Sequence, residues 1–524
     1  MTALSADRPV ESLVVVGGGS AGWLTAGLVA AELRRQGSGI RVSLVESPDV
    51  SPIGVGEGTW PTMRASLIRM GISETDFFRC CDASYKQGTQ FVDWLRGEGE
   101  RYYHPFTPPR GFSEINLARY WQDLRDRVPF SAAVAPQAAV CERQLGPKQI
   151  AMPEYASPLN YGYHLDAGKF ATLLQKHCVE QLGVEHLLEN VDSIENDESG
   201  DIRSLHTASG RVISGELFVD CTGMRSLLLG EHFGVPFRDM DHVLFNDRAL
   251  AVQVPRASDD EAIASVTLST AREAGWIWDI ALPTRRGVGY TYSSRHSSDE
   301  RAEEVLRDYL GQTASPQFSA SCTPRLIRFR PGYRERFWHR NCIAIGLSAG
   351  FVEPLEASAL VMIELSAKYL GELMPPNREV MDIVAERFNR KFGGHWERII
   401  EFLKLHYVLS ERDDSNYWRE HREVGSVPES LRESLQLWRY HCPWHGDQAQ
   451  VDELFSTASY QYVLYGMDFH SRGVGESGAA AQTTAERANT LFTENARETQ
   501  KMLAALPSNR ELIDKIQRYG LSRV

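Results

Sequence analysis

Glu356 stands out among the acidic residues because its surroundings are apolar. Leu355 and Ala357 flank it, and the apolar run 360–362 follows shortly after. An unpaired carboxylate is unfavourable in such a setting, and shifted buried acids are common at catalytic sites. Glu356 is therefore a candidate catalytic acid–base residue that accepts a proton from a reacting molecule. The alternative is a carboxylate at the start of a helix, stabilised by the helix dipole.

Lys86 is the second candidate, within Ser84-Tyr85-Lys86-Gln87-Gly88. A lysine in such a segment is usually a solvated surface residue. If it is desolvated, its ammonium group donates a strong hydrogen bond, and its neutral amine is a nucleophile. The residue types alone leave all three interpretations open.

A glycine-rich turn near the N-terminus predicts an element that positions a nucleotide. Residues 13–16 are predicted to form a buried strand, 23–35 a helix and 41–45 a second strand. Between the first two lies Gly17-Gly18-Gly19-Ser20-Ala21-Gly22, which satisfies the G-x-G-x-x-G pattern. The alternative is a glycine-rich turn without a ligand, but the strand and helix context favours a dinucleotide site.

Each part of this segment has a distinct predicted role. Gly17 permits the tight turn, Gly19 lets the backbone approach a pyrophosphate, and Gly22 allows close helix–strand packing. The helix start supplies free N–H groups, and Glu46 accepts hydrogen bonds from a ribose. The predicted nucleotide contacts here are Gly17, Gly19, Ser20, Ala21, Gly22 and Glu46.

Two later strands favour FAD over NAD. Phe218-Val219-Asp220 runs into Cys221-Thr222-Gly223, and the strand 341–345 runs into Gly346-Leu347. Strands of this kind close around the nucleotide in glutathione-reductase-like folds. We therefore expect an α/β chain with a glutathione-reductase-type, Rossmann-like FAD-binding domain, with Gly223, Gly346 and Leu347 as further FAD contacts.

Several segments, in order along the chain, resemble the flavin-dependent tryptophan halogenase family. The resemblance runs from Leu13 to about Trp418. The matching segments are Ile53-Gly54-Val55-Gly56-Glu57-Gly58-Thr59-Trp60-Pro61 (like the strap G-V-G-E-A-T-x-P), residues 84–88 around Lys86, His104-Pro105-Phe106, Gly275-Trp276-Ile277-Trp278-Asp279-Ile280 and Gly350-Phe351-Val352-Glu353-Pro354-Leu355-Glu356-Ala357-Ser358.

The resemblance implies FADH2- and O2-dependent chlorination or bromination of an indole-like or other electron-rich aromatic substrate. Reduced FAD, O2 and a halide ion yield a hypohalous acid, which Lys86 receives. Glu356 takes the proton from the ring or helps Lys86 to polarise the acid. The other implied contacts are Val55, Gly56 and Glu57 for FAD, the backbone amides of Ser358 and Ala359 for the halide, His104 and Phe106 for the substrate, and Trp276 and Trp278 as a barrier between flavin and substrate.

The chain departs from the family pattern at three places. Ala281 replaces a usual proline, and Ala359 replaces a usual glycine, a change expected to alter the turn because alanine disfavours positive φ. The segment 454–462, with Tyr460 as a substrate contact, lacks the Trp and Asn of the family's F-W-x-N element. The substrate is therefore left open among free tryptophan, another indole, a pyrrole, a phenol or a larger aromatic molecule.

The overall composition excludes several other functions. The formal charge of −13 and the absence of basic runs argue against nucleic acid binding. No apolar stretch reaches the ~20 residues of a membrane span, and eight cysteines without a regular framework indicate reduced thiols and a cytoplasmic location. His441 and His445 flank Pro443 without further ligands nearby, so no metal site is expected.

Four segments are expected along the chain. Residues 1–98 form the first part of the FAD-binding domain, 99–155 a substrate-chamber insertion, 156–367 its second part with the halide motif, and 368–524 a mainly helical subdomain over the substrate. Family members depend on a separate NAD(P)H-dependent flavin reductase for FADH2, and a homodimer is left open. An FAD-dependent aromatic hydroxylase and a non-enzymatic flavoprotein are the competing interpretations.

Overall fold

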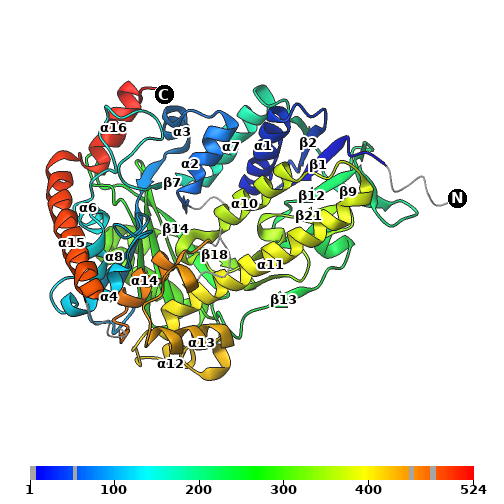
Figure 1. The fold of residues 1–524 in the computed structure, drawn as a ribbon. Coiled ribbons are helices and arrows are strands. Elements are labelled where there is room, and N and C mark those ends of the chain that lie inside the picture. The colour runs from blue at the N-terminus through cyan, green and yellow to red at the C-terminus, as the bar shows by residue number, and fades with distance from the viewer. Residues whose placement is uncertain (1–7, 51–55, 448–453, 473–478, 524) are drawn as a thin grey trace.

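The computed structural model describes residues 8–50, 56–447, 454–472 and 479–523 (Figure 1). Val55, expected to contact FAD, lies outside the described residues. In the described part, no helix is long and apolar enough to cross a membrane. All eight cysteines are described and none forms a disulfide, whereas the cytoplasmic location stays a prediction.

A six-stranded sheet forms around the N-terminal strand. Its order is β20 (Trp338–His339), β21 (Cys342–Ala344), β12 (Leu217–Asp220), β1 (Ser12–Val16), β2 (Arg41–Glu46) and β8 (Glu185–Leu188). All neighbours are parallel except β20 and β21. The apolar run of β1 is buried because it lies in the middle of the sheet.

Helix α1 (Ser20–Arg35) follows the glycine-rich turn and packs against α7 (Ala167–Glu180) and α10 (Ser358–Glu372). The strand, turn, helix and second strand predicted from the first residues are thus present, with α1 beginning three residues earlier than expected. The Rossmann-like α/β fold is confirmed.

A seven-stranded sheet forms the second layer. Its order is β18 (Arg325–Arg328), β14 (Arg248–Pro255), β17 (Arg285–Tyr292), β16 (Gly275–Ala281), β15 (Thr267–Arg272), β5 (Gly88–Val92) and β6 (Arg101–Pro105). Helix α8 (Asp299–Thr313) packs on it through a separate apolar cluster that includes Tyr290 and Leu306. Strand β16 is the fourth of the seven, and because it lies at the centre of the sheet all of its residues are buried.

Three small sheets complete the strand structure. They are β3 (Gly56–Gly58), β7 (Gly162–Asp166) and β4 (Ser84–Lys86); β11 (Val212–Ser214), β10 (Ile202–Thr207) and β9 (Val191–Asn196); and β13 (Phe237–Asp239), β19 (Gly332–Arg334) and β22 (Gly350–Phe351). In the first, Lys86 lies opposite Gly162 and Gly58 opposite His164.

Beyond α10 the described elements are helices. They are α11 (Arg378–Val408), α12 (Asn416–Glu420), α13 (Glu429–Trp438), α14 (Thr457–Gly466), α15 (Ala479–Ala505) and α16 (Asn509–Tyr519). Figure 1 shows α14 and α15 beside the short helices of the expected insertion: α15 contacts α5 (Phe130–Val134) and α6 (Gln137–Glu142). The remaining α-helices are α2 (Thr62–Met70), α3 (Glu74–Cys81), α4 (Leu117–Trp121) and α9 (Pro316–Ser321). The boundaries at 98, 155 and 367 stay a prediction.

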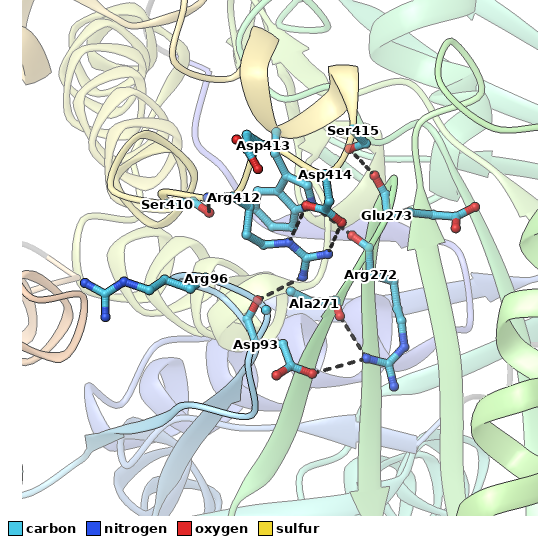
Figure 2. A network of polar contacts seen from close by, with 12 residues as sticks. Asp93, Arg96, Ala271, Arg272, Glu273, Ser410, Arg412, Asp413, Asp414 and Ser415 are labelled. Carbon is cyan, nitrogen blue, oxygen red and sulfur yellow. Dashed lines mark hydrogen bonds and ion pairs between the residues drawn. The ribbon is translucent and has the colours of Figure 1, made fainter.

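A polar network anchors the segment that follows α11 to the seven-stranded sheet (Figure 2). Arg412 Nη1 donates to the Asp93 carbonyl at 2.9 Å, and the guanidinium pairs with both carboxylate oxygens of Asp414 at 3.0 and 2.6 Å. Ser415 Oγ donates to the Glu273 carbonyl at 2.5 Å, in the turn between β15 and β16. The end of α11 is thereby held against the hairpin that contains β16.

Candidate active site

A cavity of about 670 Å³ contains most of the residues expected to do chemistry. Its lining includes the predicted nucleotide contacts Gly17, Gly19, Ser20, Ala21, Glu46, Gly56, Glu57, Gly223, Gly346 and Leu347. It also includes Lys86, Glu356, Ser358, Ala359, Trp276 and Trp278. Residues far apart in the sequence therefore surround one space. Gly22 does not line it.

The glycine turn has the geometry that the sequence pattern requires. Gly17 has a φ of +118°, and a Cβ there would lie 2.2 Å from the Cys221 carbonyl oxygen. A Cβ at Gly22 would lie 1.8 Å from the Gly17 carbonyl oxygen, so Gly22 serves helix–strand packing rather than the cavity wall. At Gly19, the residue before α1, a Cβ would meet nothing within 4 Å. The backbone at the start of α1 is thus open to an anionic ligand.

Glu46 ends β2 and lines the same cavity. Its Oε2 lies 2.9 Å from Nε2 of His186, a residue of β8 that the sequence did not single out. His186 therefore orients the carboxyl group at the cavity wall.

Lys86 is buried, with a residue exposure of 1%. Burial lowers the pKa of its ammonium to about 8, although the charge of Glu356 opposes the shift. Among the described residues no side chain hydrogen-bonds or pairs with its Nζ, which lies 5.3 Å from the centre of the Phe106 ring. The interpretation of Lys86 as a solvated surface residue is therefore wrong.

Glu356 is held by residues from three separate elements. His104 Nδ1 of β6 lies 2.6 Å from Oε1, and His406 Nε2 of α11 lies 3.5 Å from the same oxygen. Thr89 Oγ1 of β5 donates to Oε2 at 3.2 Å. Burial alone would raise the pKa of Glu356, but the two imidazoles outweigh it and hold the pKa below its ordinary value.

The backbone at Glu356 is unusual because two consecutive non-glycine residues are left-handed. Glu356 has a φ of +60° and Ala357 a φ of +55°. Trp60 Nε1 donates to the Glu356 carbonyl at 2.7 Å and helps to hold this conformation. Such strain persists only where surrounding contacts enforce it, and it is frequent at functional sites.

Helix α10 begins immediately after this turn, at Ser358. The N–H groups of Ser358 and Ala359 lie in its first turn, where α10 itself offers no acceptor and no side chain caps them, and the 3-10 turn Leu355–Ala357 directly precedes them. Ala359 is helical, and the positive φ values occur at Glu356 and Ala357 instead. The expectation that alanine at position 359 disturbs the turn is therefore wrong.

Trp276 and Trp278 alternate along β16, and both line the cavity. Their ring centres lie 6.3 Å apart. Trp278 is seated over Gly289 of β17, where a Cβ would come within 2.1 Å of its ring. Trp276 instead donates its Nε1–H to Glu353 Oε2 at 2.6 Å. The two indoles thus form one fixed wall of the cavity.

Six aromatic rings form a second cluster, which we call the aromatic chamber. Phe455 stacks on Phe402 with centres 3.9 Å apart and meets Trp60 edge-on at 5.0 Å. The members are Trp60, His104, Phe106, Phe402, Phe455 and Tyr460, linked by further ring contacts of 5.0 to 6.5 Å. His104, Phe106 and Tyr460 are therefore together as expected, although none of the six lines the 670 Å³ cavity.

Several site residues were missed by the sequence analysis. Phe402 and His406 are four residues apart on α11, so the helical period places them on one face. The i, i+4 spacing of these two aromatic residues is a signal that the sequence analysis could have used, because it places both on the face of α11 that turns toward Glu356. Thr89 and His186 have no sequence signal beyond their residue type.

The fold and the cavity together define a glutathione-reductase-type flavoprotein oxidoreductase. The features that define it are the Rossmann-like sheet, the open glycine turn at α1, and a second sheet that completes the cavity with two tryptophans, a buried lysine and a strained glutamate turn.

The family model for tryptophan halogenase matches residues 12–483, and the chain belongs to this family. Tryptophan 7-halogenase KtzQ of Kutzneria sp. (strain 744) is 32% identical over 98% of this chain and 99% of its own length. The crystal structure of a tryptophan halogenase from Shewanella frigidimarina NCIMB 400 is 48% identical, with a TM-score of 0.95 over 99% of this chain and 100% of that one. BrvH, a flavin-dependent halogenase from Brevundimonas sp. BAL3, is 32% identical, with a TM-score of 0.85 over 97% and 99% of the two chains.

The chain is accordingly a flavin-dependent halogenase, an oxidoreductase that uses FADH2 and O2 to halogenate an aromatic substrate. The aromatic hydroxylase alternative is not favoured.

Proposed function

We propose that this enzyme halogenates a neutral indole-type ring, with Lys86 and Glu356 as its catalytic residues. One observation carries the proposal: Lys86 and Glu356, far apart in the sequence, are both buried at one cavity that also holds the glycine turn and the uncapped start of α10. A structural role would not require two buried, ionisable side chains beside open backbone donors.

The cavity residues fit FAD. The open backbone at Gly19 and the first turn of α1 suit a pyrophosphate, and Glu46 suits a ribose. Gly56, Glu57, Gly223, Gly346 and Leu347 complete the proposed contacts. When bound, FADH2 supplies the oxidised halogen by reaction with O2 and a halide ion.

The N–H groups of Ser358 and Ala359 are the proposed halide ligands. They are backbone donors without a side-chain cap at the positive end of α10, and a halide is a compact anion without hydrogen-bond donors of its own. Trp276 and Trp278 form the proposed barrier, which keeps the aromatic substrate away from the flavin.

Lys86 is proposed to hold the hypohalous acid. Since burial lowers its pKa only to about 8, the ammonium form predominates near neutral pH. Its Nζ has no competing partner among the described residues and lies beside Phe106, at the border of the aromatic chamber. The ammonium group therefore donates a hydrogen bond that polarises the acid toward the substrate ring.

Glu356 is proposed to stabilise the positive charge that develops on the ring and to accept the ring proton at Oε2. Its lowered pKa keeps it ionised. A carboxylate bound by two imidazoles is a weak base, but a protonated arene is a strong acid, so the transfer remains favourable. His104 and His406 fix the carboxylate orientation.

The aromatic chamber supports the substrate class. Its members are aromatic rings, with Tyr460 as the one phenol among them, and their faces suit a flat, neutral, electron-rich ring. The segment 454–462 lacks the tryptophan and asparagine expected for an enzyme that grips free tryptophan. Relatives named tryptophan 6- or 7-halogenases act on that amino acid, whereas we propose indole itself or a neutral derivative here.

The experiment combines the purified enzyme with FAD, NADH and a separate NAD(P)H-dependent flavin reductase, the proposed source of FADH2. Indole, tryptophan, a pyrrole and a phenol are each offered with chloride or bromide, and products are identified by mass spectrometry. We expect halogenated indole to form fastest and to require halide. A hydroxylated product that persists without halide would contradict the proposal, and preferred turnover of tryptophan would contradict the substrate class. Gel filtration of the same sample tests whether a homodimer forms.

A further inference from the structure

Glu353 is a buried acid to which the proposed mechanism assigns no role. It lies three residues before Glu356, has an exposure of 1% and lines the same cavity. Its Oε2 accepts three hydrogen bonds, each of 2.6 Å, from Trp276 Nε1, Tyr407 Oη and Asn246 Nδ2. Three short bonds to one oxygen hold this side chain in a single position.

The other oxygen of the same carboxyl group has no such contacts. Among the described residues, Glu353 Oε1 has no hydrogen-bond partner although it is buried. Burial raises the pKa of Glu353, whereas the three donors and the charge of Lys404 act to lower it. The bonds at Oε2 are therefore what hold the carboxyl group, and Glu353 acts as a fixed acceptor.

Trp276 depends on such an acceptor more than Trp278 does. The ring of Trp278 is seated over Gly289, so the neighbouring strand restricts it sterically. Trp276 is restricted by the bond to Glu353 and by Trp94, whose ring centre lies 6.2 Å away. Trp276 is 1% exposed, so packing also confines its ring, but loss of the bond would leave its buried Nε1–H without an acceptor and would favour a shifted ring position that regains one.

Tyr407 connects this contact to the catalytic turn. It is adjacent to His406 on α11, and His406 contacts Glu356 while Tyr407 donates to Glu353. One helical turn thus holds both acids of the loop that leads into α10.

We propose that Glu353 is a positioning residue for the halogenation reaction, which fixes the Trp276 indole as part of the barrier between flavin and substrate. This inference rests on the barrier role proposed for Trp276. Glu353 acts through Trp276 and need not touch the substrate, halide or flavin.

The primary test compares Glu353→Gln with Glu353→Met. Glutamine keeps a carbonyl acceptor for the three donors, whereas methionine keeps the volume and removes the acceptor. The readout is the ratio of halogenated indole to hydrogen peroxide per FADH2 oxidised, measured together with the rate of flavin oxidation. We expect Gln to stay within about twofold of the parent and Met to lower the ratio about tenfold at an unchanged oxidation rate. An unchanged ratio in Glu353→Met, or a tenfold fall in Glu353→Gln, would overturn the inference.

A double-mutant cycle shows whether Glu353 acts through Trp276. In a Trp276→Phe background, Glu353→Met should lower the ratio less than about twofold further, because the partner is already gone. If Glu353→Met lowered the ratio tenfold in that background as well, Glu353 would not act through Trp276. Trp276→Phe alone separates the barrier role of Trp276 from the positioning role of Glu353. If Trp276→Phe leaves the ratio unchanged, the proposed barrier role is wrong. If Trp276→Phe lowers the ratio but Glu353→Met does not, only the role of Glu353 is wrong.

Two further variants distinguish the loss of this hydrogen bond from a general loss of folding. Tyr407→Phe removes one of the three donors and should lower the ratio about threefold, and it carries the test if Glu353→Met does not fold. Tyr417→Phe is the matched control, since Tyr417 Oη donates to Asn246 Oδ1 in the same buried cluster without contacting Glu353. Its ratio should equal that of the parent; an equal fall in both tyrosine variants would mean that general loss of packing explains the effect.

Discussion

The flavin-side cavity and the aromatic chamber differ in how they are prepared for their ligands. The cavity is about 670 Å³ in volume, and its glycine turn, helix N-termini and tryptophans lie around open space. In the chamber, Phe455 is 2% exposed and stacks on Phe402 with ring centres 3.9 Å apart. The first is formed in advance, whereas the second is filled by side chains of the enzyme.

This difference indicates that the two regions have different roles in the enzyme. When a ligand binds to a preformed cavity, little free energy is spent on ordering the side chains around it. Such a cavity suits a cofactor that is needed in every turnover. A chamber closed by its own rings must rearrange to admit a substrate ring, so its side chains determine which rings enter. Catalysis and substrate choice should therefore respond separately to mutation.

The largest expected effect follows from removal of the lysine at the border of the two regions. Lys86→Ala should leave FAD binding and flavin oxidation intact but lower halogenation by about 10³-fold or more, because no other described side chain offers an ammonium there. Single-turnover assays that follow flavin absorbance and halogenated product together would check this. Halogenation within tenfold of the parent would remove Lys86 from its role.

A smaller loss is expected at the carboxylate that faces the same border. Glu356→Gln keeps the shape of the side chain and removes its charge, so product formation should slow by about 10²-fold. Thr89→Val is the comparison, since it removes only the 3.2 Å hydrogen bond and leaves both histidines in place. The same assay measures both, and near-normal turnover of Glu356→Gln would limit Glu356 to maintaining the turn.

The pH profile separates the two possible forms of Lys86. If the ammonium is required, product per flavin oxidised should be constant below pH 8 and fall about tenfold per pH unit above the pKa of about 8. The charge that acts on Lys86 is that of Glu356, which stays ionised, and the neighbouring His164 stays neutral because burial lowers its pKa. Glu57, whose pKa burial raises to about 7, lines the same cavity. Flavin oxidation measured in the same samples reports any effect of Glu57. A ratio that rises above pH 8 would instead identify the amine as the reactive form.

The aromatic chamber should show the mildest effect on chemistry and the clearest effect on substrate range. Phe455→Ala removes the ring that fills the chamber, so KM for bulkier indoles should fall roughly tenfold while kcat for indole changes little. Steady-state kinetics over a series of indoles would measure this, with Phe455→Leu as the control that keeps most of the volume. A parallel loss of kcat for every substrate would show that Phe455 supports the active site instead of filling it.

The sequence predicted the nucleotide side better than the substrate side for a physical reason. The glycine turn and Glu46 belong to one continuous segment whose backbone geometry follows from local residue types. The clamp around Glu356 joins His104, Thr89 and His406 from three elements, so it exists only after the chain has folded. The expected disturbance at Ala359 was wrong because the left-handed residues lie two and three positions earlier.

Helix α11 gives the enzyme an unusual sensitivity to insertions. It has 31 residues and is therefore ~46 Å long. Its last turns present Phe402 to the chamber, His406 to Glu356 and Tyr407 to Glu353, and the network around Arg412 holds its far end. One inserted residue would rotate everything beyond it by ~100° and misplace all three side chains at once. Exchanges at the exposed positions of α11 should therefore be tolerated far better than any change in its length.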